Sequence, residues 1–364
     1  MTYQEALETL EKCRYCLMCR HADPLSHVSF NEALTPHGIA LTIYSEHKGL
    51  LSWNEDSLRT VFSETDAGVA RSHCATDQPF SEAVSAVKSE LLSQGKMPET
   101  VARLKERLEQ TPSFFGDAEF KSALEQNDYA LFISDEMQYL WPESVNAVNT
   151  LIKALTLSPA EITRGKSSGF LALSLGFMEQ AKKQAKQLMT ELEAVKAKEL
   201  IVLSQTDLYT CRHVYAERLG LSFPEEVKVT SLLALLTQAY KNGKLSFKPS
   251  ADTRPYAYID PSQALRVKDF DSPRHLLGAI LPGNQVELFW RKERTHPTGS
   301  GSTWFSNPEL AEKLTRARLE DAQKQGAEVI YCEDSADLSQ LNRYAADYGL
   351  ELKGLYELLA DHLG

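Results

Sequence analysis

Three cysteines stand two residues apart near the start of the chain, at Cys13, Cys16 and Cys19. A thiolate is the ligand that soft metals, such as the iron of iron–sulfur clusters, prefer. A C-x2-C-x2-C run brings three thiolates around one short turn of backbone, and a fourth completes the set that a [4Fe–4S] cluster needs. The spacing therefore predicts an iron–sulfur site whose fourth ligand lies elsewhere in the sequence.

The fourth thiolate is predicted to be Cys74. In bacterial two-cluster ferredoxins the run C-x2-C-x2-C-x3-C-P supplies three ligands to one cluster, and its last cysteine binds the other cluster. Here Asp23 stands at that last position, directly before Pro24, and the second run keeps only its final cysteine, Cys74. By the crossed rule Cys74 completes the first cluster, whereas the second set has lost all its cysteines. The positions of that second set are Asp23, Glu64, Ala67 and Ala70.

The start of the chain thus resembles a two-cluster ferredoxin module reduced to one [4Fe–4S] cluster on Cys13, Cys16, Cys19 and Cys74. Two alternatives stay open, which are a structural zinc site and cysteines that merely pack as small hydrophobic residues. Zinc sites more often use paired C-x2-C units, and this favours the cluster. A c-type haem is excluded because Arg20, and not a histidine, follows Cys19.

Composition narrows the class of protein. The 364 residues are 43% hydrophobic and 24% charged, which is ordinary for a soluble globular chain of two or three domains. The net charge of −11 argues against a nucleic-acid-binding surface. No apolar run approaches the roughly 20 residues that span a bilayer, and residues 1–12 lack a secretion signal. We therefore expect the cytoplasm, where cysteines bind metals rather than form disulfides.

Helical periodicity surrounds both cysteine runs. Apolar residues recur at helix spacing over 1–12, 31–51 and 80–110, and the last stretch is long enough for one or two amphipathic helices. Residues 1–110 are therefore predicted to form an all-helical, ferredoxin-like module with its cluster ligands in loops between helices. Residues 111–127 are predicted to connect this module to the next domain.

The rest of the chain contains a repeat, because the run at 227–236 aligns with the run at 350–359. In each repeat a β-like stretch is followed by a long helix and then by a second short apolar run. This alternation predicts two repeated α/β domains with mainly parallel sheets, at 128–250 and 254–364. The expected strands are 129–133 and 200–203 in the first domain and 256–259 and 329–332 in the second.

This layout resembles the iron–sulfur subunits that join a helical ferredoxin module to two cysteine-rich CCG domains. Examples are the glycolate oxidase iron–sulfur subunit, the small subunit of anaerobic glycerol-3-phosphate dehydrogenase and heterodisulfide reductase subunits. The family motif P-E-L-A-x-K-L stands at 308–314, and P-R-x-L-L stands at 273–277. The cysteine motifs are degenerate. They match 134–135, 167–169 and Cys211 in the first repeat, and 260–262, 297–301 and 332–335 in the second.

Most of the cysteines of those family motifs are replaced here by Asp, Ser, Pro or Thr. Serine hydroxyls are poor ligands for iron–sulfur iron, and Cys211 and Cys332 are too few to hold a further cluster within either domain. We therefore expect both domains to keep the fold without redox chemistry of their own. Cys211 and Cys332 are expected to be buried structural residues.

The resemblance implies an electron-transfer subunit. Family members work beside FAD-containing dehydrogenases, so the expected function is a one-electron relay between such a partner and an acceptor, which is a quinone, a ferredoxin or another flavoprotein. A hetero-oligomer is expected, and no acid, base or nucleophile of this chain is assigned bond chemistry. The alternative is a structural or assembly subunit of a flavoprotein complex, in which a cluster or zinc holds the module together.

A third hypothesis places a small polar ligand in a cleft between the two repeats. It ranks last, because the residues concerned are identified only by the cysteines that they replace. These residues are Asp135, Ser167, Asp260, Ser262 and His296.

Overall fold

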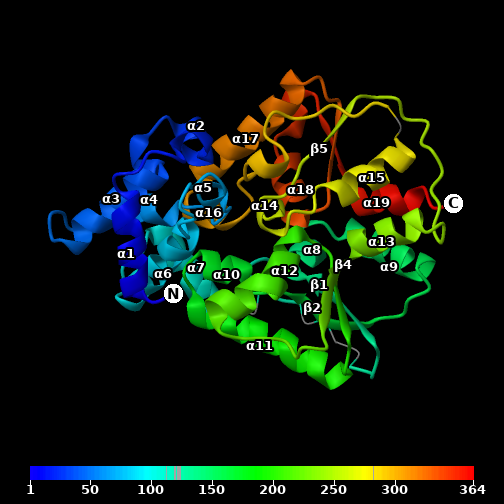
Figure 1. The fold of residues 1–364 in the computed structure, drawn as a ribbon, viewed down its shortest axis with the longest axis horizontal. Helices are drawn as coiled ribbons and strands as arrows, with labels where there is room; N and C mark the ends of the chain where they lie inside the picture. The colour runs from blue at the N-terminus through cyan, green and yellow to red at the C-terminus, as the bar shows by residue number, and fades with distance from the viewer. Residues whose placement is uncertain (112, 119, 121–123, 282) are drawn as a thin grey trace.

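The computed structural model describes residues 1–111, 113–118, 120, 124–281 and 283–364. A helical module at the N-terminal end adjoins two parallel β-sheets with helices packed around them, and Figure 1 shows this order from blue to red. The predicted α/β class with parallel sheets is confirmed. Within the described part of the chain, no helix combines the length and the apolar character needed to cross a bilayer.

The helices of the N-terminal module begin at capping side chains. Thr2 and Glu5 form a capping box at the start of α1, and the Thr35 hydroxyl accepts the Gly38 amide at the start of α3. α1 packs on α3 and α6 around a core of buried aliphatic and aromatic side chains. The α-helices of the module are α1 (Tyr3–Cys13), α2 (Pro24–Ser29), α3 (Pro36–His47), α4 (Glu55–Phe62), α5 (Val69–Ser72), α6 (Phe80–Ser93) and α7 (Glu99–Gln110).

The helices expected at 1–12, 31–51 and 80–110 are present with different ends, whereas α2, α4 and α5 were not expected from the sequence. The stretch predicted at 31–51 is a 3₁₀ turn followed by α3, and the stretch at 80–110 divides into α6 and α7. The division falls at Gly95, which has a positive φ of 70°, and at Pro98, which precedes α7. The predicted connection at 111–127 lies partly outside the described residues.

The first α/β unit contains a four-stranded parallel sheet in the order β2-β1-β3-β4. Its central strands are buried along almost their whole length, as expected for a sheet covered by helices on both faces. The strands are β1 (Tyr129–Ser134), β2 (Ala160–Lys166), β3 (Glu199–Val202) and β4 (Lys228–Ser231). The α-helices are α8 (Asp135–Leu140), α9 (Glu143–Ala154), α10 (Phe170–Ser174), α11 (Met178–Val195), α12 (Gln205–Tyr209), which continues into a π-helix (Thr210–Leu219), and α13 (Leu232–Lys241).

The second unit has a parallel sheet in the order β5-β6-β7. A further parallel bridge joins Gln285 to Tyr256 of β5. Gln285 therefore lies beside β5 in the position that corresponds to β2 beside β1 in the first sheet. The strands are β5 (Tyr256–Tyr258), β6 (Val329–Cys332) and β7 (Glu351–Gly354). The α-helices are α14 (Ala264–Val267), α15 (Asp271–Ile280), α16 (Ser302–Ser306), α17 (Pro308–Lys324), α18 (Ser335–Asn342) and α19 (Leu355–Asp361).

Two glycines show how closely the units correspond. Gly169 and Gly299 have positive φ angles of 103° and 90°, and each precedes a short helix that leads into a long one. A Cβ at Gly169 would lie 2.9 Å from the backbone oxygen of Ala181, and a Cβ at Gly299 would lie 2.3 Å from that of Ala311. Both positions therefore require glycine for the same two reasons, the left-handed backbone and the close approach of the following helix.

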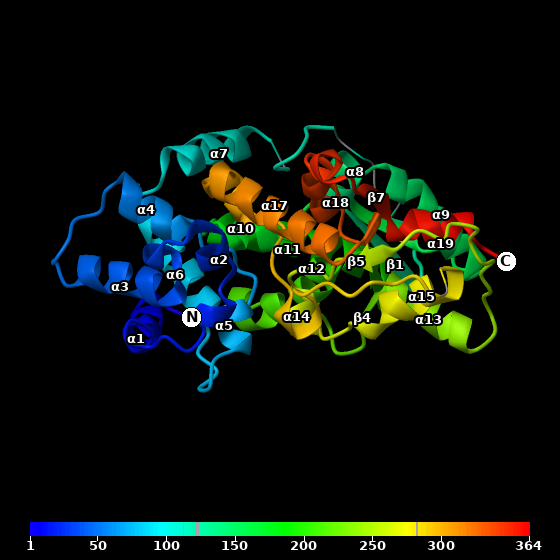
Figure 2. The same ribbon diagram turned by 90° about the horizontal axis from the view of Figure 1, so that it is seen from above.

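The two units pack against each other through reciprocal pairs of helices. α9 contacts α19 and α13 contacts α15, while α8 contacts α18 and α12 contacts α14. One hydrophobic core extends across these contacts and contains side chains of both sheets. α8, α12, α14 and α18 each follow a strand, so the carboxyl ends of strands from both sheets meet at this interface (Figures 1 and 2).

Asp66 joins the helical module to both units. Its carboxylate is inaccessible to solvent and accepts hydrogen bonds from Arg218 of the first unit and Arg266 of the second, both at 2.9 Å. Its backbone oxygen accepts two more, from Gln263 and again from Arg266. A second contact is apolar: α2 of the module packs on α17, which reaches back from the second unit (Figure 2).

Candidate functional site

The four predicted cluster ligands lie around one cavity in the helical module. Cys13 is the last residue of α1, Cys16 and Cys19 follow in the loop after it, and Cys74 follows α5. The cavity measures about 460 Å³, including its opening to solvent, and all four side chains line it. The structure thus brings together residues that are distant in the sequence.

Tight turns present the first three thiols to the cavity. The Cys16 amide donates to the Cys13 oxygen at 3.0 Å, and the Ala22 amide donates to the Cys19 oxygen at 3.1 Å. Such consecutive turns direct residues at three-residue spacing toward one side of the backbone. Arg14 packs its guanidinium between the rings of Tyr15 and Tyr44, at 4.0 and 3.8 Å from their centroids, and so anchors the loop to α3.

The Cys74 sulfur already has hydrogen-bond partners of the kind found around cluster sulfurs. The backbone amide of Gln78 donates to its Sγ at 3.3 Å, and the Thr76 hydroxyl lies 3.5 Å from it. Burial would raise the pKa of Cys74, but these hydrogen bonds outweigh burial and the pKa is lowered. Donors of this type stabilise negative charge on sulfur and thereby raise the reduction potential of a cluster.

Two of the other thiols resist ionisation in the absence of a cation. Burial, followed by the neighbouring Cys74 and Cys16, raises the pKa of Cys13 to about 11. Burial, followed by Asp23, raises the pKa of Cys19 to about 12. Since thiolates are the metal-binding form, positive charge in the cavity is needed to ionise this set near neutral pH.

The donor set fits a [4Fe–4S] cluster. Four thiols of one cavity match the four irons of such a cluster, each of which needs one protein ligand. Across the described residues, no group of three or more His, Cys, Asp or Glu side chains is arranged to hold a single metal ion. A cluster does not require that arrangement, because each thiolate binds a different iron atom and the sulfurs therefore stand further apart.

The positions that the ligands of a second cluster would occupy are engaged in packing and in other hydrogen bonds. Ala67 belongs to a small hydrophobic cluster that includes Leu265 from the second α/β unit. The Asp23 carboxylate caps α2 by accepting the Ser26 amide at 2.7 Å, and burial raises its pKa to about 7. Glu64 is buried and accepts a hydrogen bond from a serine hydroxyl of α6 at 2.8 Å.

His37 lines the thiol cavity and was not identified from the sequence. It stands in the first turn of α3, and its buried Nδ1 has no hydrogen-bond partner among the described residues. A buried imidazole nitrogen beside the thiols is able to donate to a cluster sulfur. Only the contact between α3 and the cysteine loop reveals this position, because no spacing rule connects His37 to the cysteines.

The residues proposed from the sequence for the cleft between the repeats are mostly engaged elsewhere. Among the described residues, Ser262 alone of the five lines that cleft. Asp135 is buried and its carboxylate accepts a hydrogen bond from the Ser113 hydroxyl. The Asp260 carboxylate accepts a hydrogen bond from the Arg274 guanidinium at 2.7 Å. The remaining two are likewise engaged: the Ser167 hydroxyl accepts the Gly169 amide, and the His296 ring stacks on Trp290.

Cys211 and Cys332 are buried, as the sequence predicts. Burial raises the pKa of both thiols well above the usual value, so neither is a thiolate near neutral pH. Cys211 packs in the hydrophobic core of the first unit, Cys332 lies fully buried at the end of β6, and neither lines the thiol cavity of the helical module.

Comparison with known proteins gives a fold but no family. No protein-family model and no curated protein matches the chain. A solved structure of a hypothetical protein from Helicobacter pylori is similar to 90% of this chain and 68% of its own, with a TM-score of 0.63 and 8% identity. Two other structures are more distant. The aspartate racemase of Picrophilus torridus has a TM-score of 0.29 and 9% identity, over 64% of this chain and 91% of its own. An aspartate racemase homologue from Pyrococcus horikoshii has a TM-score of 0.28 and 15% identity, over 65% of this chain and 96% of its own. At such identities the first match shows a shared fold alone, and the two racemases carry no argument.

Proposed function

We propose that the chain binds one [4Fe–4S] cluster through Cys13, Cys16, Cys19 and Cys74 and serves as a one-electron relay. Its expected partners are an FAD-containing dehydrogenase as donor and a quinone, ferredoxin or flavoprotein as acceptor. The observation that carries this proposal is that the four thiols, and no other cysteine among the described residues, line one cavity. When bound, the cluster supplies single-electron chemistry; the protein supplies ligands, burial and hydrogen bonds.

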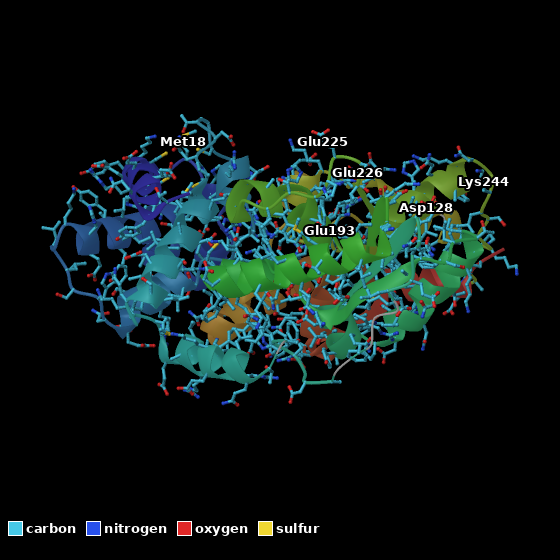
Figure 3. All side chains as sticks on the ribbon, turned by 90° about the horizontal axis from the view of Figure 1, so that it is seen from below. Met18, Asp128, Glu193, Glu225, Glu226 and Lys244 are labelled. Atoms are coloured by element: carbon cyan, nitrogen blue, oxygen red, sulfur yellow. The ribbon has the colours of Figure 1, made fainter. Side chains whose placement is uncertain are left out.

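The surroundings of the cavity suit electron exchange with a partner. Cys16 is exposed, and the neighbouring Tyr15, Leu17 and Met18 expose 78%, 53% and 57% of their surface. Figure 3 shows Met18 at the outer edge of the molecule. Exposed apolar side chains of this size are typical of contact surfaces, and here they surround a predicted redox centre. A partner bound at this loop would lie directly against the cluster.

The ligand set is tested by substitution and metal analysis. Cys74→Ser should lose the cluster, because a serine hydroxyl is a poor ligand for its iron. Cys211→Ser is the matched control, since this thiol lies outside the cavity and should leave about four irons and four sulfides per chain after anaerobic preparation. Zinc in place of iron would refute the cluster, and full iron content in Cys74→Ser would refute the ligand assignment.

The relay is tested separately from the metal site. The loaded protein should be reduced by a flavoprotein dehydrogenase that co-purifies with it, and the reduced form should give the electron paramagnetic resonance signal of one reduced cluster. Leu17→Ser should slow this reduction and leave the iron content unchanged, because Leu17 is exposed and does not line the thiol cavity. A cluster that keeps one oxidation state while the flavoprotein turns over would contradict the relay and support a structural role.

A further inference from the structure

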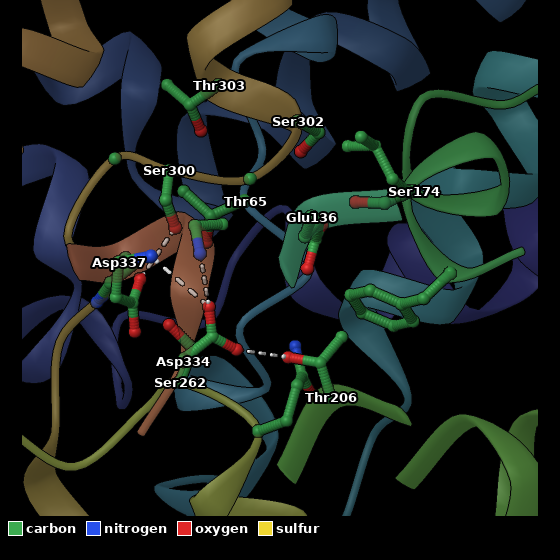
Figure 4. A pocket seen from close by; sticks show the side chains of 17 residues that line it. Thr65, Glu136, Ser174, Thr206, Ser262, Ser300, Ser302, Thr303, Asp334 and Asp337 are labelled. Carbon is green, nitrogen blue, oxygen red and sulfur yellow. Dashed lines mark hydrogen bonds between the residues drawn. The ribbon is translucent and has the colours of Figure 1, made fainter. Parts of the chain in front are cut away.

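A second cavity lies where the two α/β units and the helical module meet. It measures about 570 Å³, including its opening to solvent, and it lies beside the carboxyl ends of strands from both sheets. In open parallel sheets this is the edge at which ligands bind. Figure 4 shows its polar side chains converging from all three parts of the chain, with Thr65 from the module, Ser174 from the first unit and Ser302 from the second.

Glu136 is the charged group of this cavity that lacks a partner. It stands in the first turn of α8, and no hydrogen bond joins its carboxyl to another described side chain. The two other acids of the lining are already engaged. Asp334 accepts the amides of the first turn of α18, and Asp337 accepts the Ser300 hydroxyl at 2.6 Å.

Ser174 gives independent evidence that the cavity takes a polar ligand. Its side chain is 1% exposed and its hydroxyl has no hydrogen-bond partner among the described residues. In Figure 4 this hydroxyl points from α10 toward the side of the cavity that carries Glu136. A buried hydroxyl without a partner loses about 1–3 kcal/mol of solvation, so a ligand that binds it removes a cost of the free protein.

The sign of the local charge decides the class of ligand. No Lys, Arg or His is present among the described residues that line the cavity. Arg318 lies near Asp337 but does not line the cavity, and its guanidinium donates a hydrogen bond to the backbone oxygen of Trp290 at 2.7 Å. Serine and threonine hydroxyls form most of the remaining polar lining. The Lys88 ammonium lies behind the wall, where it donates to the backbone oxygens of Glu64 and Ser174, and it is not among the lining residues. An anion would therefore find no counter-charge in the lining, whereas a cation that also carries hydroxyl groups would find partners of both kinds.

We propose that this cavity binds a small primary ammonium compound of the amino-alcohol class, with its ammonium on Glu136 and its hydroxyl among the serines. The Ser174 hydroxyl would accept one ammonium hydrogen. The Ser262 and Ser302 hydroxyls, which also line the cavity, would bind the alcohol. Phe170 lines the same space and offers an aromatic ring to the cation.

The proposal implies that affinity rises with pH. Burial, followed by the carboxyls of Asp334, Asp135, Asp207 and Asp337, raises the pKa of Glu136 well above its usual value. Asp135 lies in α8, Asp207 in α12 and Asp337 in α18, Asp334 directly precedes α18, and all four are acidic. An entering ammonium favours the ionised carboxylate, so a proton should leave Glu136 for the solvent as the ligand binds.

Three probes of one carbon skeleton test the charge preference. Ethanolamine, ethylene glycol and glycolate differ in carrying a positive, zero or negative charge, and each is titrated calorimetrically into the full-length protein. Ethanolamine alone should bind, more tightly at pH 8 than at pH 6, and its binding enthalpy should vary with the ionisation enthalpy of the buffer. Preferred binding of glycolate, or saturable binding of Mg²⁺ or Ca²⁺ without binding of ethanolamine, would overturn the proposal.

Two substitutions locate the site. Glu136→Gln keeps the shape of the side chain and should weaken ethanolamine binding by at least about tenfold, since it removes the charged partner. Ser174→Ala removes a hydroxyl that has no hydrogen-bond partner among the described residues, so the variant should fold normally and still bind several-fold more weakly. Glu143→Gln, an exposed acid on α9, is the control. Unchanged affinity in both cavity variants would refute the site.

Discussion

Asp66 offers the sharpest test of how the helical module is held. The change is Asp66→Asn, which keeps the size of the side chain and tolerates the left-handed backbone that the residue adopts at φ 51°. It removes the charge that compensates Arg218 and Arg266, whose side chains are only 8% and 11% exposed. The variant therefore leaves two buried guanidinium groups facing a neutral amide.

The magnitude follows from the burial of all three groups. Removing one partner of a buried ion pair typically costs about 3–5 kcal/mol, because the remaining charge loses its compensation. Two features reduce the loss here: Glu82 lies 3.6 Å from Arg266, and the backbone oxygen of Asp66 still accepts two hydrogen bonds. We expect the free energy of unfolding to fall by about 3 kcal/mol, a large fraction of the stability of an ordinary domain.

Urea unfolding followed by circular dichroism measures this change, and the pH dependence gives a second check. Burial alone would raise the pKa of Asp66, but Arg218 and Arg266 outweigh it and the pKa is lowered. A carboxylate with a depressed pKa stabilises the fold above its unfolded pKa and loses that effect as pH falls through the folded value. The difference between wild type and variant should therefore shrink in acid.

The control is Asp77→Asn, which breaks the ion pair with Arg71 in which Asp77 is 73% exposed. Ion pairs open to solvent contribute little, so this variant should unfold close to wild type. Equal destabilisation by both substitutions, or a difference between Asp66→Asn and wild type that does not change with pH, would show that the buried charge does not hold the module in place.

Three further outcomes are expected. Burial raises the pKa of Asp135 from 3.8 to about 7, so the stability that the protonated carboxyl contributes is lost as pH rises from 3.8 through 7. At pH 8 Asp135→Asn should therefore unfold at higher urea than wild type, with a free energy of unfolding larger by up to about 4 kcal/mol. At pH 4 it should not. Gly299→Ala should cost clearly more stability than Gly349→Ala, because both have positive φ but only the first places a Cβ against backbone, as thermal melts will show. Asp23→Ala should lower the melting temperature through the lost α2 cap, worth about 1 kcal/mol, and leave the iron count unchanged.

Local sequence rules predicted the parts of the molecule that depend on local spacing. The predicted strands coincide with β1, β3, β5 and β6 within one or two residues, because short apolar runs between helices specify buried strands. Cys74 could be paired with the first three cysteines because the crossed ferredoxin rule is itself a spacing rule. The correspondence of Gly169 and Gly299 follows instead from the resemblance to the CCG motifs and not from a spacing rule.

The rest depends on contacts between elements that no spacing rule connects. No sequence pattern marks Asp66, although it contacts two arginines from two later units. His37 meets the cysteine loop only because α3 packs on α1. The cleft hypothesis named the residues that replace the family's cysteines. Glu136, which follows one of these residues, instead carries the lining carboxyl that has no hydrogen-bond partner among the described side chains. The degenerate motifs thus lie near this edge of the sheets, but most of the side chains that line the cavity there stand at other positions.

Lys88 connects the two candidate sites physically. It is fully buried in α6, and its ammonium donates to the backbone oxygen of Glu64 at 2.8 Å and to that of Ser174 at 3.0 Å. Glu64 belongs to the loop between the two cysteine runs. Ser174 and Thr65, the residue after Glu64, both line the second cavity, where the two α/β units and the helical module meet. A buried ammonium needs both carbonyl partners to offset its lost hydration, so the loop and α10 cannot separate without cost. The two hydrogen bonds of Lys88 therefore connect the wall of the second cavity to the loop that leads to Cys74.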